Sequence, residues 1–515
     1  MSPIPGLDED CAMLVLNSME TSTLLTMALT SRAAIHPVRL RLVHDPRLPT
    51  GARASSFLTF VLDHSLEQAL HILRFDVRTL DQVDSWPTFL ADVLQRATNL
   101  SRLEVYLNLT GPEYSRIFGA CEERFFHALV SLTPALTHLH LSLCHPDDLT
   151  ALRGIRGLRY LWLSPSFNSM NPEMMASNMS SIKVIIEGNA DTLEDIWLMC
   201  PSSKGSDIRF ARTCPHVTRF AFFAVSIDYT NLSQTFPHVQ RLEQSYELKT
   251  PEDLGASPPV WPELTTLVTT DVLLQPTLAR GDYPLLRCLI IADIRPYYSP
   301  SWFEGILGTI RRFHIHELSL RKVTIPPEEL DKSSQYNDGL VAAFLSQLLD
   351  SAPHLRKLDL AFRPEYYGAR VDNVTRIVPD SAFHAHALQS LTSLSFALPQ
   401  HARGILSGQA LEKFARAWLA VCPVLVHVRI SLREQQFKWT RRWETDDEAQ
   451  LRSVVTPQYR INSVSRWKDD ETSVFADTDV DCESAAWSST FYTLPTADAS
   501  CVQFEGDKML TEFSF

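Results

Sequence analysis

The sequence of 515 residues lacks the short motifs by which most catalytic and metal sites are recognised. It contains no P-loop, no nucleophile elbow of the form G-x-S-x-G, no H-E-x-x-H and no C-x-x-C pair. Three H-x-H pairs occur, but the sequence nominates no third ligand for any of them. We therefore predict a protein that is not an enzyme and that needs no cofactor and no metal.

Long apolar runs and paired cysteines are also missing. No stretch approaches the 18 apolar residues of a membrane helix, and Asp8, Glu9 and Asp10 stand where a signal peptide needs a basic and then apolar start. The nine cysteines are odd in number and widely scattered, which is typical of free thiols in a reducing compartment. These features predict a cytoplasmic or nuclear protein, or both, with no membrane partner.

Positive charge is scarce. The chain has 47 Lys and Arg against 60 Asp and Glu, a formal net charge of −13, and no long basic block offsets this excess. A nucleic-acid backbone would be repelled rather than bound, so we predict no nucleic-acid partner. The hydrophobic fraction of 45% is ample for a packed interior and argues against a disordered chain.

What the sequence does contain is a repeated pattern, L-x-x-L-x-L, in which other apolar residues substitute for leucine. Thirteen copies follow one another at steps of 22 to 40 residues, and those at Val239 and Leu264 are weaker because Gln244 and Thr269 take the third apolar place. The copies begin at Leu70, Leu100, Leu136, Leu158, Leu193, Val217, Val239, Leu264, Leu286, Ile315, Leu355, Leu391 and Leu425.

Each copy predicts a short strand, because alternate residues of a strand point to the same side. In the copy at Leu136, Leu139 and Leu141 would face the core while His138 and His140 face outward. Seven copies follow a proline two residues earlier, which ends the preceding element. Cysteine precedes three prolines of the chain, and we interpret Cys200, Cys214 and Cys422 as small core residues at such breaks.

Between the strands the apolar spacing becomes that of a helix. Such stripes are formed by Phe89, Leu90, Val93, Leu94 and Ala97, by Trp302, Phe303, Ile306, Leu307 and Ile310, by Leu340, Phe344 and Leu348, and by Leu411, Phe414, Ala415, Trp418 and Cys422. Alternating strands and helices in one direction resemble the leucine-rich repeat family across about residues 65 to 435. The resemblance implies an α/β fold, a horseshoe-shaped solenoid, with residues 46–435 as the repeat domain; the alternative is a doubly wound α/β domain.

Residues 1–45 do not fit the repeat and are predicted to form short helices. The strings Leu7-Asp8-Glu9-Asp10, Val15-Leu16-Asn17-Ser18-Met19 and Leu24-Leu25-Thr26-Met27-Ala28-Leu29-Thr30-Ser31-Arg32 resemble an F-box, with Asp8 in place of the usual proline. The resemblance, typical of fungal proteins with irregular leucine repeats, implies binding to a Skp-type adaptor through exposed apolar side chains: Leu7, Val15, Leu16, Met19, Leu24, Leu25 and Leu29. The alternative is a helical cap over the first repeat.

The outward residues of the first strands nominate a surface for a protein partner of unknown identity. They are rich in Tyr, Trp and Arg, the residue types that dominate protein interfaces. The predicted partner-binding residues are Arg102, Glu104, Tyr106, His140, Tyr160, Trp162, Asp195, Trp197, Arg219 and Arg241. The outward residues of the later strands are small and suggest no such surface.

After about residue 435 the strand signal stops, and residues 436–515 are predicted to form a C-terminal cap and an acidic tail. The aromatic residues Trp439 and Trp443 favour packing of the first part. Asp477, Asp479 and Asp481 alternate like EF-hand ligands, but Cys482 and Ser488 occupy the positions where that loop needs glycine and glutamate.

Together these features predict the substrate-recognition subunit of a Skp–cullin–F-box type ubiquitin ligase. The N-terminal helices would recruit the adaptor, and the strands would bind the protein target. The alternative function is an interaction scaffold with no link to ubiquitin, in which the N-terminal helices are only a cap.

Overall fold

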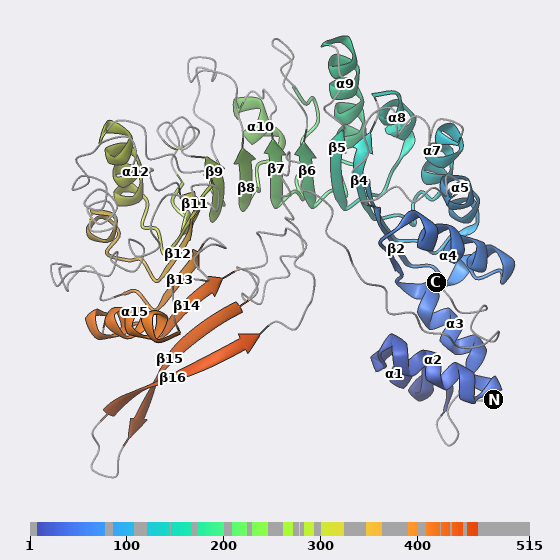
Figure 1. Cartoon of the computed structure of the whole chain (residues 1–515). Coiled ribbons are helices and arrows are strands. Elements are labelled where there is room, and N and C mark those ends of the chain that lie inside the picture. Colours follow the sequence, from blue (N-terminus) through green and yellow to red (C-terminus); the bar gives the residue numbers. More distant parts are fainter. Residues whose placement is uncertain are drawn as a thin grey trace, which may run out of the picture. The chain divides into compact units, whose positions relative to one another are not determined.

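The computed structural model describes residues 8–77, 86–107, 121–144, 146–165, 172–199, 209–223, 229–245, 261–270, 278, 283–292, 300–323, 347–362, 390–398, 408–422, 424–432, 435–445 and 451–461. These residues form two compact units, which we describe separately (Figure 1). Unit 1 contains the described residues up to Val239 together with Trp261. Unit 2 contains Gln240–Ser245 and the described residues from Pro262 onward.

Unit 1 alternates helices and strands. Its elements are α1 (Glu9–Ser18), α2 (Thr21–Thr30), η1 (Arg32–Ala34), α3 (Ile35–His44), β1 (Arg47–Leu48), α4 (Gly51–Asp63), η2 (Glu67–Ala69), β2 (Ile72–Val77), α5 (Trp86–Arg96), β3 (Arg102–Leu107), α7 (Glu122–Ser131), β4 (His138–Cys144), α8 (Pro146–Ala151), η3 (Leu152–Gly154), β5 (Tyr160–Pro165), α9 (Pro172–Gly188), β6 (Asp195–Met199), β7 (Arg219–Phe223) and α10 (Tyr229–Thr235). The strands β1 to β7 pair in parallel, each with the next in the sequence.

Unit 2 continues the alternation and ends in a hairpin. Its elements are β8 (Arg241–Ser245), β9 (Thr266–Thr270), β10 (Cys288–Ala292), α12 (Pro300–Arg312), β11 (Glu317–Val323), β12 (Lys357–Phe362), β13 (Ser393–Leu398), α15 (Gly408–Val421), β14 (His427–Leu432), β15 (Gln435–Thr445) and β16 (Leu451–Ile461). The strands β8 to β14 are parallel, whereas β15 and β16 are antiparallel to their neighbours. The chain is therefore a mixed α/β protein built on open, mostly parallel sheet.

The thirteen predicted strands are confirmed, and each begins two residues after the first apolar residue of its pattern. The first residue of the pattern is buried in the turn, and the other two point from the strand to the same side, as Leu136, Leu139 and Leu141 do. The residue before each strand also joins its neighbour: the Thr137 N–H donates to the Ser101 carbonyl at 2.9 Å. One turn residue and two strand residues thus build each layer of the core.

The helices α4, α5, α7, α8 and α9 of unit 1 lie side by side on one side of its strands (Figure 1). Their apolar stripes supply the other half of the core, as the spacing predicted. Leu90, Val93 and Leu94 of α5 are buried, and in unit 2 Ile306, Leu307 and Ile310 of α12 and Leu411, Ala415 and Trp418 of α15 are buried as well. Of the stripe at Leu340, Phe344 and Leu348, only Leu348 is among the described residues, and it is buried.

The first three helices form a small cluster with its own core. Leu16 of α1, Leu24 and Ala28 of α2, and Ala34 and Val38 from the third segment pack together. Asp8 caps α1, since its carboxylate accepts the Cys11 N–H at 2.7 Å. The helical segment ends at His44 and β1 begins at Arg47.

Three strands were not predicted from the sequence. The strand β1 is only two residues long, which is too short for a pattern of alternation to be visible. The expectation of no strand after residue 435 is wrong, because β15 and β16 extend the sheet of unit 2. They lack the L-x-x-L-x-L pattern because they follow one another directly, with no helix to return the chain in parallel, although Phe437 and Trp439 do alternate with polar residues.

The two Cys-Pro cysteines that the structure describes, Cys214 and Cys422, are fully buried, as predicted. Burial raises the pKa of each thiol to about 12, so both stay neutral. Cys200 lies outside the described residues, as does the acidic segment with Asp477. Cys11, Cys121, Cys214, Cys288 and Cys422 are free thiols.

Asn189, buried after α9, joins two consecutive strand turns and gives a test of the packing. Its side-chain oxygen accepts the Leu158 N–H at 3.0 Å, and its amide nitrogen donates to the carbonyls of Ile155 at 3.0 Å and Ile185 at 2.8 Å. Asn189→Leu leaves these groups unsatisfied and is expected to lower the free energy of unfolding by about 2 to 4 kcal/mol in urea titrations. The control Asp191→Ala removes only an exposed ion pair with Arg212 and should cost about 0.5 kcal/mol or less; equal losses would contradict this role of Asn189.

Candidate functional site

The N-terminal helices carry two of the most exposed large apolar side chains among the described residues. Leu14 of α1 is 68% exposed and Leu29 of α2 is 57% exposed. Leu29 is one of the predicted adaptor-binding residues, and three more of them, Val15, Met19 and Leu25, are partly exposed. Several exposed apolar side chains on one small helical cluster are a feature of binding surfaces.

The expectation that Leu16 and Leu24 are exposed is wrong. Both are buried, because three short helices can only stay together by enclosing some of their leucines. Leu7 lies outside the described residues. Leu14 was not predicted as a binding residue, although helical spacing indicates that it is exposed. Ala12 and Leu16, four residues apart, face inward, and Leu14 lies between them on the other side of the helix.

The outward side chains of β2 to β7 form the second candidate surface, here called the unit 1 strand face. Parallel pairing places Glu104, His140, Trp162 and Trp197 in register on consecutive strands. Tyr106 lies diagonally beside His140, with ring centroids 4.0 Å apart. The rings continue from His140 to Trp162 at 4.0 Å and from Trp162 to Trp197 at 3.9 Å. These four rings, Tyr106, His140, Trp162 and Trp197, are the aromatic row.

A shorter stack runs beside the aromatic row. His138 and Tyr160 lie at 4.0 Å with nearly parallel rings. Because the rings of both stacks face one another across the strands, they offer mainly their edges to a partner. This geometry favours hydrogen bonds and contacts to ring edges over flat stacking of a sugar or a base.

Ion pairs flank the aromatic row. Glu104 accepts a hydrogen bond from Arg102 Nε at 2.5 Å and lies 3.6 Å from Arg74 Nε, while Arg74 also lies 3.4 Å from the Asp45 carboxylate. On the other flank Arg219 lies 3.7 Å from Asp195. Arg74 was not among the predicted residues, although it occupies the position of Glu104 on the preceding strand and was detectable from the strand register.

Burial keeps the histidines of the unit 1 strand face neutral. Burial, and secondarily the positive charge of Arg102, lowers the pKa of His140 well below its usual value. The same causes, with Arg159, lower the pKa of His138 to about 4. Both rings are therefore uncharged at neutral pH, and the charge on this face comes from its arginines and carboxylates.

Not every predicted partner-binding residue is accessible. His140 is only 7% exposed and Trp197 is buried as well, although both point outward from their strands. Rings on consecutive strands cover each other, so the outward position predicted from alternation does not guarantee contact with solvent. Tyr106, Tyr160 and Trp162 remain partly exposed.

The structure groups nine of the ten predicted partner-binding residues on unit 1. The tenth, Arg241, belongs to unit 2 and donates through Nε to Glu243 at 2.6 Å. We therefore restrict the candidate site to the strand face of unit 1. Glu243 is itself buried on β8, which makes its pairing with Arg241 part of the packing.

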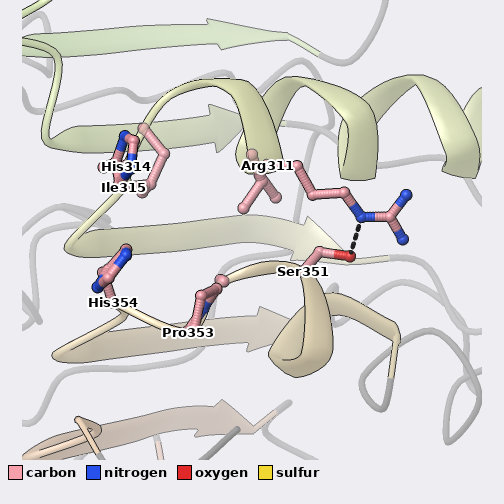
Figure 2. Close-up of a pocket in the computed structure, with 8 residues that line it drawn as sticks. Arg311, His314, Ile315, Ser351, Pro353 and His354 are labelled. Carbon is pink, nitrogen blue, oxygen red and sulfur yellow. Dashed lines mark hydrogen bonds between the residues drawn. The ribbon is translucent and has the colours of Figure 1, made fainter.

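A pocket of about 100 Å³ lies in unit 2, between the end of α12 and the turn before β12. Figure 2 shows the residues that line it. Arg311 Nε donates to Ser351 Oγ at 3.0 Å, and the rings of His314 and His354 stack at 5.1 Å. The guanidinium points away from the two imidazoles (Figure 2). The polar groups thus do not converge on one point, as they would at a ligand site.

Within the described ranges no cluster of three or more His, Cys, Asp or Glu side chains could hold a metal ion. The same part of the chain contains no helix with the length and apolar character needed to cross a membrane. No protein-family model matches the sequence, and the search of curated proteins found no match.

Proposed function

We propose that this chain is the substrate-recognition subunit of a Skp–cullin–F-box type ubiquitin ligase. In this proposal α1 to α3 are an F-box that binds the Skp-type adaptor, and the strand–helix units form a leucine-rich-repeat solenoid. The unit 1 strand face binds the protein to be modified. The chain itself catalyses nothing, since the ligase complex supplies the chemistry.

The observation that carries the proposal is that some leucines of the first helices are buried while others are exposed. Leu16 and Leu24 build the core of the cluster, whereas Leu14 and Leu29 remain in water. Exposing two leucines to water is unfavourable by roughly 1.5 to 3 kcal/mol each relative to full burial. A partner that covers them recovers part of this free energy, as an adaptor would.

The target surface rests on a second observation. The aromatic row is only partly covered, and ion pairs fix the arginines beside it. Interfaces combine such rigid aromatic and arginine side chains at their centre. Since His138 and His140 are neutral, binding of a target at this face should vary little between pH 6 and pH 8 through these two residues.

One alternative also has structural support. The ring of His44, at the end of α3, stacks on His71 at 4.6 Å, and the His71 N–H donates to the His44 carbonyl at 3.2 Å. Asp45 pairs with Arg74 of β2. Contacts of this kind are expected of a helical cap on the first strands, so the second candidate is an interaction scaffold without a link to ubiquitin.

Adaptor binding distinguishes the two candidates. In a pull-down with purified Skp-type adaptor, the double substitution Leu14→Asp and Leu29→Asp is expected to weaken retention by about tenfold or more, because it places charges in the interface. Both side chains are exposed, so circular dichroism should not change. Substitutions at Leu16 would not separate binding from folding.

The matched control is Leu285→Asp, which makes the same change at a leucine that is 47% exposed on the turn before β10. It should leave adaptor retention unchanged. Failure of the intact chain to retain the adaptor would support the scaffold instead. Equal loss in the control would show that the helical leucines have no special role.

A further inference from the structure

The last strand of the terminal hairpin, β16, lies at an edge of the sheet in unit 2 (Figure 1). Within the described ranges it pairs with β15 on one side and with no strand on the other, here called its free side. Its 11 residues make this edge about twice as long as an average strand. An edge strand presents a row of unpaired N–H and C=O groups, so the free side of β16 is a place where a strand of another chain can add.

The direction of the backbone groups in the hairpin follows from one hydrogen bond. The Arg441 N–H of β15 donates to the carbonyl of Val426, the residue before β14, at 2.8 Å. Residues of an antiparallel pair bond alternately, so odd-numbered residues of β15 bond toward β14 and even-numbered ones toward β16. The register joins odd-numbered residues of β15 to odd-numbered residues of β16, such as Trp439 to Pro457. The odd-numbered residues of β16 therefore direct their backbone groups to its free side.

Pro457 is one of these odd-numbered residues. A proline has no N–H, and its ring occupies the place from which the hydrogen would reach a partner. The ladder between β15 and β16 consequently loses no hydrogen bond at Pro457, whereas the free side loses a donor and is obstructed there. Proline inside a sheet is confined to such edge positions. The longest uninterrupted stretch of the free side is then 451–456, about half of the strand.

We propose that Pro457 prevents β16 from pairing with β16 of a second copy of this chain. A second copy is the partner that suits this edge, because two identical antiparallel strands are complementary about a twofold axis. The β-branched and aromatic residues of the strand, Val454, Val455, Thr456 and Tyr459, favour strand pairing. Pro457 opposes this tendency and keeps the chain from self-association at β16. The role is independent of adaptor binding by the N-terminal helices.

The experiment compares the full chain with its Pro457→Val variant by gel filtration with light scattering, over an about hundredfold range of concentration. The unchanged chain is expected to have the mass of one chain throughout. Pro457→Val restores the N–H and introduces a residue that favours strands, so its mass should rise toward that of two or more chains as concentration increases. The proposal is overturned if the variant stays monomeric, or if the unchanged chain associates as strongly as the variant does.

The matched control is Gln458→Val, which introduces the same side chain at the next residue, where the N–H is directed to β15. It adds no donor to the free side and should leave the chain monomeric. In the double variant Pro457→Val with Val455→Pro, a proline returns to the free side at another odd-numbered position, and self-association should be lost again. If the control or the double variant associates as strongly as Pro457→Val, the cause is not the donor and the proposal is wrong.

Two single proline substitutions test the assignment of the two sides without any association. Thr456→Pro removes an N–H that is directed to β15, so urea unfolding followed by circular dichroism should show a lower midpoint for unit 2. Val455→Pro removes an N–H from the free side and should shift the midpoint much less. Equal shifts would contradict the assigned directions, and with them the role of Pro457. This comparison decides the question even if Pro457→Val precipitates.

Discussion

Leu139→Asp is expected to destabilise unit 1 by about 4 to 6 kcal/mol, enough to abolish cooperative folding in a marginally stable protein. Leu139 is buried in β4, and parallel pairing places it between Leu103 and Leu161, both of which are buried too. A carboxylate there has no hydrogen-bond donor within the layer of leucines. The measurement is urea unfolding monitored by tryptophan fluorescence and circular dichroism.

The two histidines beside Leu139 provide graded controls. His138→Asp should cost about 1 kcal/mol or less, because His138 is half-buried and the charges of Arg102 and Arg159 act on it, so they would favour a carboxylate. His140→Asp should cost about 2 to 3 kcal/mol, since it replaces a neutral ring packed between Tyr106 and Trp162. If His138→Asp were as damaging as Leu139→Asp, the assignment of inward and outward residues on β4 would be wrong.

The strands were predictable because each one buries side chains on a single face and because this pattern of buried residues recurs from strand to strand. Leu136, Leu139 and Leu141 occupy one layer, and the next copy of the pattern must fill the next layer in the same register. A helix in between brings the chain back, which forces the strands to be parallel. Even the weaker copy at Val239 forms a strand, since Gln244 is buried there and donates to Thr269 Oγ1 at 2.9 Å.

Accessibility on the outward side was less predictable. Alternation distinguishes the two faces of a strand, but it contains no information about the neighbouring strand. His140 and Trp197 are outward and nevertheless buried, because rings from adjacent strands stack on them. In unit 2 the same side buries Asp359 and Ser319.

The N-terminal helices show a similar limit. A string of leucines that resembles a family motif indicates which residues are apolar. The packing of the three helices decides which of these side chains are buried. Leu16 and Leu24 lie in the core, and Leu14 and Leu29 do not. Only the spatial arrangement therefore identifies the side chains that a binding experiment should alter.

The hairpin at the end of unit 2 covers the last parallel strand, β14, without a further helix. Arg441 of β15 donates through its guanidinium to the carbonyls of Leu419 and Cys422, at the end of α15. Its backbone N–H donates to the Val426 carbonyl at 2.8 Å. The last carbonyls of a helix have no partners within the helix, so this arginine satisfies groups that would otherwise be left open.

Trp439→Ala is therefore expected to lower the free energy of unfolding of unit 2 by about 3 to 5 kcal/mol. Trp439 is 1% exposed and lies opposite Val428 of β14, on the same side of β15 as Arg441. Removing the indole leaves a cavity beneath the hairpin and exposes the region of β14 that it covers. Urea unfolding should show the loss as a lower transition midpoint.

The conservative substitution Trp439→Phe separates packing from hydrogen bonding. No described atom accepts a hydrogen bond from the Trp439 indole N–H, so phenylalanine loses only part of the packed volume and no polar contact. It should cost about 1 to 2 kcal/mol. If Trp439→Ala cost as little as Trp439→Phe, the hairpin would contribute little to unit 2, and β15 and β16 would be an appendage rather than the last layer of its core.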